Sequence, residues 1–162
     1  MKDFAYYLHL FSDNQNVPEI SARSWCVWRK KANGKYMHYY GKRIHKVREI
    51  ASLTKMITAM TALDFIEKYK WNPANIYYEV KKTSTLIGGT TAKLVEGQIC
   101  SLLELFYGMM LPSGNDAAIA VSEIIGILAF VKGRGKHINP ESQNWYKPFS
   151  KSYSYLFIGM MN

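Results

Sequence analysis

The chain has 162 residues, of which 48% are apolar and 20% charged, and its formal net charge is +9. These values are typical of a globular domain with a core of its own, and they exclude an intrinsically disordered chain. The longest apolar run, residues 124–131, is far shorter than the roughly 20 residues that a membrane-spanning helix needs. The sequence therefore predicts one globular domain and no membrane span.

The number and spacing of the cysteines and histidines argue against a disulfide framework and against a metal site. Cys26 and Cys100 are too few for a disulfide framework, and no cysteine or histidine has the spacing of metal ligands. We interpret both cysteines as buried free thiols and predict no metal and no cofactor.

The first residues lack the apolar stretch and the cleavage site of a secretory signal, which indicates either a cytosolic chain or an export signal outside this sequence.

The charge excess lies in one stretch, residues 20–48, which has nine basic residues and no acidic one. The rest of the chain carries twelve basic and twelve acidic residues. Tryptophans and tyrosines are interleaved with these cations, and the mixture has two interpretations. More often it is a strand pair with a solvated, charged face; less often it is a surface that binds an anionic polymer. The basic residues are Arg23, Arg29, Lys30, Lys31, Lys35, Lys42, Arg43, Lys46 and Arg48.

In chain order, residues 1–16 predict a poorly ordered lead-in. Residues 24–29 and 36–40 alternate bulky and polar side chains around an Asn-Gly turn, which predicts a β-hairpin. After a loop over residues 41–49, apolar residues recur at helical spacing over residues 51–68. This helix is predicted to be central and largely buried. Ser52 lies in its first turn, where backbone N–H groups lack intrahelical acceptors.

The second half of the chain predicts shorter elements. A breaker at residues 71–74 ends the first helix, residues 76–80 predict a short strand, and a glycine-threonine loop follows at residues 88–91. Residues 101–110 predict a second helix, and residues 117–130 a third. Beyond residue 132 the sequence indicates a polar loop to residue 148 and the beginning of another helix at residues 152–162.

Two short motifs indicate the chemistry, Ser52-Leu-Thr-Lys55 and Ser113-Gly-Asn115. A serine and a lysine three residues apart share one face of a helix. Once its amine is uncharged, the lysine can take the proton of the serine hydroxyl, and the serine becomes an acylating nucleophile. The second motif adds another hydroxyl and an amide. Together the two motifs predict acyl transfer through a covalent serine intermediate.

Each of these residues also has a purely structural interpretation. Ser52 can be an ordinary first-turn residue and Lys55 a solvated lysine. Ser113 can be a turn residue, and Asn115 can be the N-cap of a helix that begins one residue later. Either motif alone is a weak signal because its residues are common. Both motifs in order, with the flanking stretch Leu-Leu-Glu-Leu-Phe-Tyr-Gly-Met-Met-Leu at residues 102–111, form a stronger one.

Three stretches of the chain resemble the serine D-alanyl-D-alanine carboxypeptidases, low-molecular-weight penicillin-binding proteins that are related to the serine β-lactamases. They are residues 51–59 (Ala-Ser-Leu-Thr-Lys-Met-Ile-Thr-Ala), 89–97 (Gly-Thr-Thr-Ala-Lys-Leu-Val-Glu-Gly) and 103–120, which include Ser-Gly-Asn-Asp-Ala-Ala. The resemblance covers roughly residues 17–128. It implies an α+β, β-lactamase/transpeptidase-like fold in truncated form, with residues 17–162 as an incomplete domain.

The resemblance also implies a role for each motif residue. Ser52 corresponds to the nucleophile that attacks the carbonyl of the penultimate D-alanine, and Lys55 to the general base. Ser113 corresponds to a proton relay toward the leaving amine, and Asn115 to the group that holds the substrate amide and positions Lys55. The implied partners are peptidoglycan stem peptides that end in D-Ala-D-Ala, and β-lactams, with no metal.

A third motif of this family, Lys-Thr-Gly or Lys-Ser-Gly, does not occur in the 162 residues. In the family it follows Ser-Gly-Asn far downstream, and it supplies an oxyanion N–H and the cation that binds the substrate carboxylate. Losing one oxyanion donor costs on the order of 10²–10³ in rate. We therefore expect this N-terminal part to have little or no activity by itself.

A different function class remains open beside the enzyme. The chain can be a non-catalytic module that binds an anionic polymer through the basic hairpin at residues 20–48, although nucleic acid is not favoured. The resemblance implies a place outside the cytoplasmic membrane, whereas the start of the sequence shows no signal for export. The compartment is therefore left open.

Overall fold

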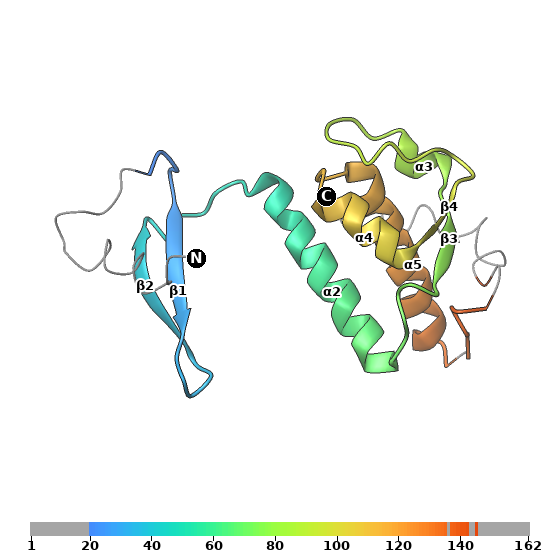
Figure 1. The fold of residues 1–162 in the computed structure, drawn as a ribbon, viewed down its shortest axis with the longest axis horizontal. Helices are drawn as coiled ribbons and strands as arrows, with labels where there is room; N and C mark the ends of the chain where they lie inside the picture. The colour runs from blue at the N-terminus through green and yellow to red at the C-terminus, as the bar shows by residue number, and fades with distance from the viewer. Residues whose placement is uncertain (1–19, 136, 143–144, 146–162) are drawn as a thin grey trace, which may run out of the picture. The chain divides into compact units, whose positions relative to one another are not determined.

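The computed structural model describes residues 20–135, 137–142 and 145, which belong to two compact units, residues 1–49 and residues 50–162. The first unit contains the strands β1 (Trp25–Lys30) and β2 (Tyr36–Lys42) (Figure 1). Among the described helices, none has both the length and the apolar character that crossing a membrane requires. The second unit contains the short 3₁₀ helix η1 (Ala51–Leu53), α2 (Thr54–Tyr69), β3 (Tyr77–Glu79), α3 (Lys82–Thr85), β4 (Ile99–Ser101), α4 (Leu102–Met110) and α5 (Asn115–Gly133).

The described part of the first unit contains the predicted β-hairpin. Strands β1 and β2 pair antiparallel, and their register shifts at a bulge between Val27 and Trp28. Gly34 has a φ of +79° in the connecting turn, a conformation that glycine adopts without steric cost. The Asn33 side chain accepts a hydrogen bond from the Lys35 backbone N–H at 3.1 Å. The Asn-Gly signal thus closes the turn as predicted.

The two thiols differ in their surroundings. Cys100 on β4 is buried, as predicted, and burial raises the pKa of its thiol, with the negative charge of Glu104 adding to the shift. Cys26 on β1 is exposed, so the prediction of a buried thiol is wrong at this position. The reason is local, because its cross-strand neighbour is Gly41, which has no side chain to cover the sulfur.

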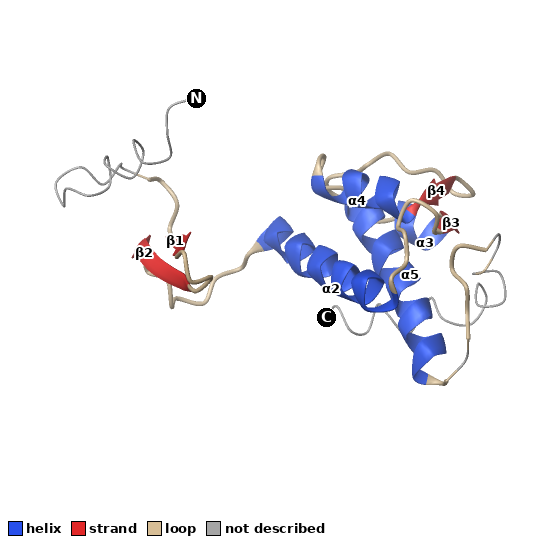
Figure 2. Ribbon diagram, turned by 60° about the horizontal axis from the view of Figure 1, so that its bottom comes forward, coloured by secondary structure: helices blue, strands red, loops and turns tan. Residues whose placement is uncertain are grey.

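Helix α5 is the centre of the second unit. It packs against α2, α3 and α4 (Figures 1 and 2), and eleven of its 19 residues are buried. The ribbon of β3 and β4 adds its own buried side chains to the same core. The largest fully buried side chains of this unit include Ile76, Tyr78, Val80, Leu102, Leu105, Met109, Val121, Ile124, Leu128 and Val131.

Helix α2 was predicted to be central and largely buried, and this prediction is wrong. Its buried residues are only Lys55, Ala62 and Ile66. They lie on one stripe of the helix. Of the large apolar side chains that suggested burial, Phe65 is partly buried against the core. The others are each at least half exposed: Leu53 of η1 and Met56, Ile57, Met60 and Leu63 of α2.

The sequence prediction also missed two short elements between α2 and α4. Strand β4 has three residues and pairs antiparallel with β3, which places Cys100 opposite Tyr78. Helix α3 is a single turn over residues 82–85. Both are too short to show a period in the sequence.

Three predictions are not tested by this structure. The predicted lead-in over residues 1–16 and the predicted helix at residues 152–162 lie outside the described residues. The prediction of one domain over residues 17–162 stays a prediction.

A capping box joins β4 to α4. The Ser101 hydroxyl accepts the Glu104 backbone N–H at 3.2 Å, and the Glu104 carboxylate accepts the Ser101 backbone N–H at 2.7 Å. The backbone and hydroxyl hydrogen bonds from Ser101 lower the pKa of Glu104 below its ordinary value. These reciprocal bonds satisfy two N–H groups that a helix start otherwise leaves without partners, and they fix where α4 begins.

We expect Ser101→Ala to lower the free energy of unfolding by about 1 kcal/mol, because it removes the cap of α4. The matched control is Ser122→Ala, whose hydroxyl bonds the Ala118 carbonyl inside α5 and caps nothing. That control should change stability by less than about 0.5 kcal/mol. Urea unfolding measures both, and equal losses in the two variants would contradict the role of the cap.

Candidate active site

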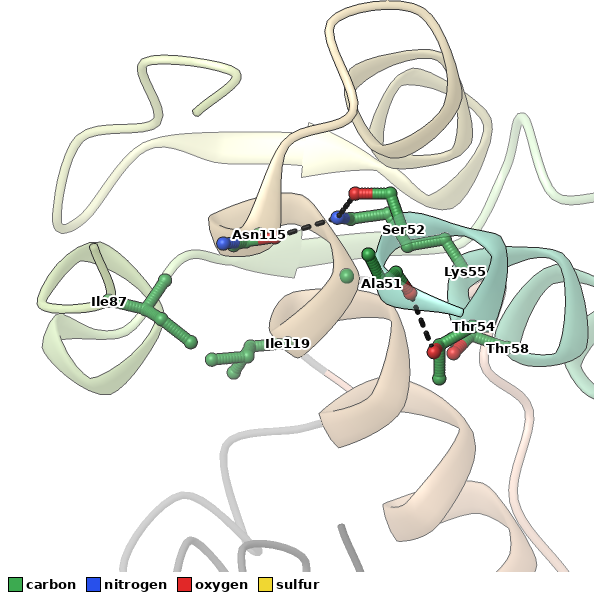
Figure 3. Close-up of a pocket in the computed structure, with 9 residues that line it drawn as sticks. Ala51, Ser52, Thr54, Lys55, Thr58, Ile87, Asn115 and Ile119 are labelled. Carbon is green, nitrogen blue, oxygen red and sulfur yellow. Dashed lines mark hydrogen bonds between the residues drawn. The ribbon is translucent and has the colours of Figure 1, made fainter. Parts of the chain in front are cut away.

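The four predicted site residues meet at the amine of Lys55. Its Nζ donates to Ser52 Oγ at 3.2 Å, to Ser113 Oγ at 3.3 Å and to Asn115 Oδ1 at 2.6 Å. Figure 3 shows the amine between Ser52 and Asn115. Lys55 is only 8% exposed, so these contacts replace most of its hydration. Three acceptors match the three N–H bonds of an ammonium group, which leaves the buried cation fully hydrogen-bonded.

Lys55 reaches this position because of the stripe that it occupies on α2. The stripe continues through Ala59, Ala62 and Ile66, at the spacing of one helix face. Ala59 packs against a buried cluster that contains Ala117 and Ala118 of α5. Alanines on both helices permit a close approach, since the distance between helix axes depends on the side chains at the contact. The lysine is carried on the same face toward the beginning of α5.

Ser52 lies in η1, immediately before α2, with its side chain exposed above the buried lysine. The residue before it, Ala51, has a φ of +44°, and Ser113 across the site has a φ of +59°. Such left-handed conformations cost a non-glycine residue on the order of 1 kcal/mol. Both strained residues lie in the turns that present a hydroxyl to Lys55. The strained backbone at Ala51 and Ser113 therefore places the Ser52 and Ser113 hydroxyls within reach of the Lys55 amine.

Asn115 does not act as the helix cap that its position suggested. Helix α5 begins at Asn115 itself, and its N-cap is Gly114, which makes no side-chain cap. The Asn115 amide instead spans the site, since its Oδ1 accepts from Lys55 and its Nδ2 donates to the Gly88 carbonyl at 2.8 Å. The Asn115 backbone N–H donates to the Thr90 carbonyl at 2.8 Å. Asn115 thus connects Lys55 to the glycine-threonine loop.

Asp116 is a site neighbour that the sequence reasoning missed as a functional candidate. Its carboxylate is 3% exposed and accepts the backbone N–H groups of Ala92 and Leu94 at 2.8 Å and 3.1 Å. It also accepts the Thr91 hydroxyl at 2.6 Å and the Ala117 backbone N–H at 2.9 Å. The signal was present in the sequence, because Asp116 and residues 91–94 both lie in the stretches that carry the family resemblance.

A groove opens beside Ser52. It has a volume of about 360 Å³, with Ser52 and Lys55 at one end. Its other walls carry apolar atoms, as the view in Figure 3 shows for Ile87 and Ile119. The groove therefore offers a place for an uncharged group next to Ser52. Across the part of the chain that is described, no three potential metal ligands from His, Cys, Asp and Glu gather in one place.

The sequence matches the family of D-alanyl-D-alanine carboxypeptidases over residues 12–135. It is 30% identical over 113 residues to the D-alanyl-D-alanine carboxypeptidase DacD of Escherichia coli, a match that covers 67% of this chain and 28% of that protein. Among solved structures, it is similar to a mutant of a Streptomyces DD-transpeptidase, with 28% identity and a TM-score of 0.56 over 66% of this chain and 40% of that one.

A second solved structure, of the D-alanyl-D-alanine carboxypeptidase DacD from Francisella tularensis, has a TM-score of 0.57 and 24% identity. The match covers 82% of this chain and 29% of that one. The chain thus spans less than half the length of each of these proteins. The structural matches confirm the predicted α+β fold of the penicillin-binding and transpeptidase type, of which the chain contains a part.

The buried carboxylate of Asp116 makes stability depend on pH. Burial by itself would raise the pKa of Asp116, but hydrogen bonds from Ala92, Thr91, Leu94 and Ala117 outweigh burial and lower it below its ordinary value. A group with a lowered folded pKa stabilises the fold above its unfolded pKa of about 3.9, and this contribution is lost as the pH falls below that value.

We expect Asp116→Asn to lower the free energy of unfolding at pH 7 by about 2 kcal/mol, because hydrogen bonds to a charged acceptor are lost. The difference between wild type and variant should shrink as the pH is lowered below about 4. Urea unfolding between pH 7 and pH 3 measures both. Stability curves that stay parallel across this range would contradict the assignment.

Proposed function

Because the chain belongs to the D-alanyl-D-alanine carboxypeptidase family, we propose that its site forms an acyl-enzyme on Ser52 with a peptide that ends in D-Ala-D-Ala. The observation that supports the proposal most is the contact of one buried amine with Ser52, Ser113 and Asn115 together. A solvated lysine or an ordinary turn serine would not bring these groups to one point. β-Lactams would acylate the same hydroxyl.

In the acylation step, Lys55 first has to be uncharged. The Ser52 hydroxyl then gives its proton to Nζ across the 3.2 Å contact, and its oxygen attacks the carbonyl carbon of the penultimate D-alanine. The Ser52 backbone N–H lies in the first turn before α2, where such groups lack an intrahelical acceptor. This N–H would be one half of the oxyanion hole.

Collapse of the tetrahedral intermediate breaks the carbon–nitrogen bond of the terminal peptide. The departing D-alanine amine needs a proton, which Lys55 would pass through the Ser113 hydroxyl across the 3.3 Å contact. The Asn115 side chain would orient the substrate amide while it holds Lys55 at 2.6 Å. Water then attacks the ester on Ser52, and the shortened peptide leaves as a carboxylate.

The 162 residues would carry out this chemistry poorly without a second N–H donor for the oxyanion and a cation that binds the substrate carboxylate. They contain neither Lys-Thr-Gly nor Lys-Ser-Gly, the motif that the family uses for both tasks. We propose that they form the nucleophile-bearing part of the active site. A missing oxyanion donor lowers the rate on the order of 10²–10³.

The test is a fluorescent penicillin followed by intact-mass analysis. We expect slow, sub-stoichiometric labelling of the 162-residue chain on Ser52, and none in Ser52→Ala. Lys55→Met, which keeps the length of the side chain without the amine, should also abolish labelling because no base remains. A penicillin adduct that persists in Ser52→Ala would contradict the assignment of the nucleophile. Rapid stoichiometric labelling would contradict the expected low activity.

The basic hairpin supports a second candidate function, the binding of an anionic polymer. Of the nine basic residues in the segment 20–48, all but Arg48 are exposed. Trp28 and Tyr36 are also more than half exposed, and the Lys30 amine lies 5.9 Å from the Tyr36 ring. Exposed cations beside aromatic rings attract polyanions through ion pairing and release of counterions.

We expect labelled polyphosphate to bind with a strong dependence on salt, and Lys30→Glu/Lys31→Glu to weaken binding about tenfold or more. The matched control, Lys68→Glu/Lys82→Glu, changes net charge equally at exposed positions outside the hairpin. It should weaken binding much less, and Ser52→Ala should have no effect. Fluorescence anisotropy at several salt concentrations measures this, and equal losses in both double variants would argue against a specific hairpin surface.

A further inference from the structure

We propose that Asp116 is a positioning residue of this active site, which acts by fixing the loop 88–94 against the first turn of α5 and so sets the orientation of the Asn115 amide. This inference rests on the proposed function. Asp116 neither contacts Lys55 in the described structure nor faces the groove, so its effect on the reaction would pass through Asn115.

The carboxylate of Asp116 organises the loop through backbone donors. Oδ1 and Oδ2 share the Ala92 N–H at 2.8 Å and 3.1 Å, and Oδ2 also accepts the Leu94 N–H at 3.1 Å. The Thr91 hydroxyl donates to the same oxygen. Every one of these partners is a donor, and an ionised carboxylate is the side chain that accepts without donating. Its place in the first turn of α5 favours a negative charge further.

The loop 88–94, held by Asp116, in turn fixes the orientation of Asn115 through two hydrogen bonds. The Gly88 carbonyl accepts from Asn115 Nδ2 at 2.8 Å, and the Thr90 carbonyl accepts from the Asn115 backbone N–H at 2.8 Å. Because Nδ2 is engaged by the loop, Oδ1 is the end of the amide that faces the Lys55 ammonium. An Asn115 amide turned the other way would present two N–H donors to a cation, which removes the 2.6 Å contact.

Two glycines show how closely the loop and the turn fit together. A Cβ at Gly89, where φ is +91°, would come within 2.8 Å of Asn115 Nδ2. A Cβ at Gly114 would come within 2.7 Å of the Ala92 nitrogen and of Asp116 Oδ1. Neither position has space for a side chain, so a small displacement of the loop would move Asn115 directly.

The test compares Asp116→Asn with Glu123→Gln in the ¹⁵N-labelled chain. Glu123 is the matched control, because it is another buried carboxylate of α5 and accepts from Tyr78 and Thr83 at 2.8 Å and 2.9 Å, away from the loop. The measurements are hydrogen exchange of the Ala92 and Leu94 amides and the side-chain amide resonances of Asn115, assigned with Asn115→Asp. Labelling of Ser52 by fluorescent penicillin is a separate readout.

In Asp116→Asn we expect exchange of the Ala92 and Leu94 amides to accelerate at least tenfold and the Asn115 side-chain resonances to shift toward those of a free amide. Glu123→Gln should leave both within about twofold of wild type, even if it lowers global stability equally. Where Ser52 is labelled in the wild type, labelling should slow about tenfold or more in Asp116→Asn only.

Unchanged Asn115 resonances in Asp116→Asn, or equal changes in Glu123→Gln, would overturn the proposal. Should Asp116→Asn fail to fold, Thr91→Val replaces it. This variant removes the 2.6 Å bond that the Thr91 hydroxyl donates to Asp116, together with the 2.8 Å bond that the hydroxyl accepts from the Lys93 backbone N–H, and it should give a smaller change of the same kind. Unchanged Asn115 resonances in that variant would overturn the proposal equally. An absence of any penicillin adduct in the wild type would count against the proposed function, while the resonances and the exchange rates would still decide the role of Asp116.

Discussion

The site depends on one constraint, which is that a buried ammonium group needs an acceptor for each of its N–H bonds. An unpaired charge inside a protein costs several kcal/mol, so Lys55 is tolerated at 8% exposure only because three oxygens converge on it. Those oxygens come from Ser52, one helical turn away, and from Ser113 and Asn115 on a distant turn. The requirement that stabilises the lysine therefore also gathers the other three residues of the candidate site, Ser52, Ser113 and Asn115, at one point.

The packing of α2 against α5 brings the Lys55 ammonium group to its three acceptors. On α2 a stripe of small or medium side chains, Ala59, Ala62 and Ile66, lies against α5, and Lys55 continues that stripe at its N-terminal end. Close contact between the helices brings the amine to the turn before α5, where the left-handed backbone of Ser113 presents its hydroxyl. A larger residue in place of Ala59 would separate the helices and withdraw the amine from its acceptors. The apolar core thus positions a polar site at its edge.

Parts of this arrangement were predictable from the sequence, and the reason differs from part to part. The contact of Ser52 with Lys55 follows from their spacing alone, because it lies within one helical turn. Nothing in spacing brings Ser113 and Asn115 to the same amine, and only the family resemblance suggested it. The prediction that α2 is largely buried is wrong because most of its large apolar side chains lie off the packed face, which Ala59, Ala62 and Ile66 form. Asp116 was missed because most of its partners are backbone N–H groups, and the spacing of residue types does not show which backbone groups a side chain will meet.

The acceptors around Lys55 are two hydroxyls and an amide, all uncharged, and this affects how easily the amine could lose its proton. Both hydroxyls among them can turn and donate, so the Ser52 and Ser113 contacts would survive when the amine has lost its charge. A carboxylate in either place could only accept, and would hold the proton on the lysine by Coulomb attraction. The carboxylate that directly follows Asn115 in the sequence, that of Asp116, is engaged instead with the donors of residues 91–94 and with the start of α5. The fold thereby separates two tasks: a charged acceptor fixes the backbone, and neutral groups surround the amine that would take up and release a proton in the proposed mechanism.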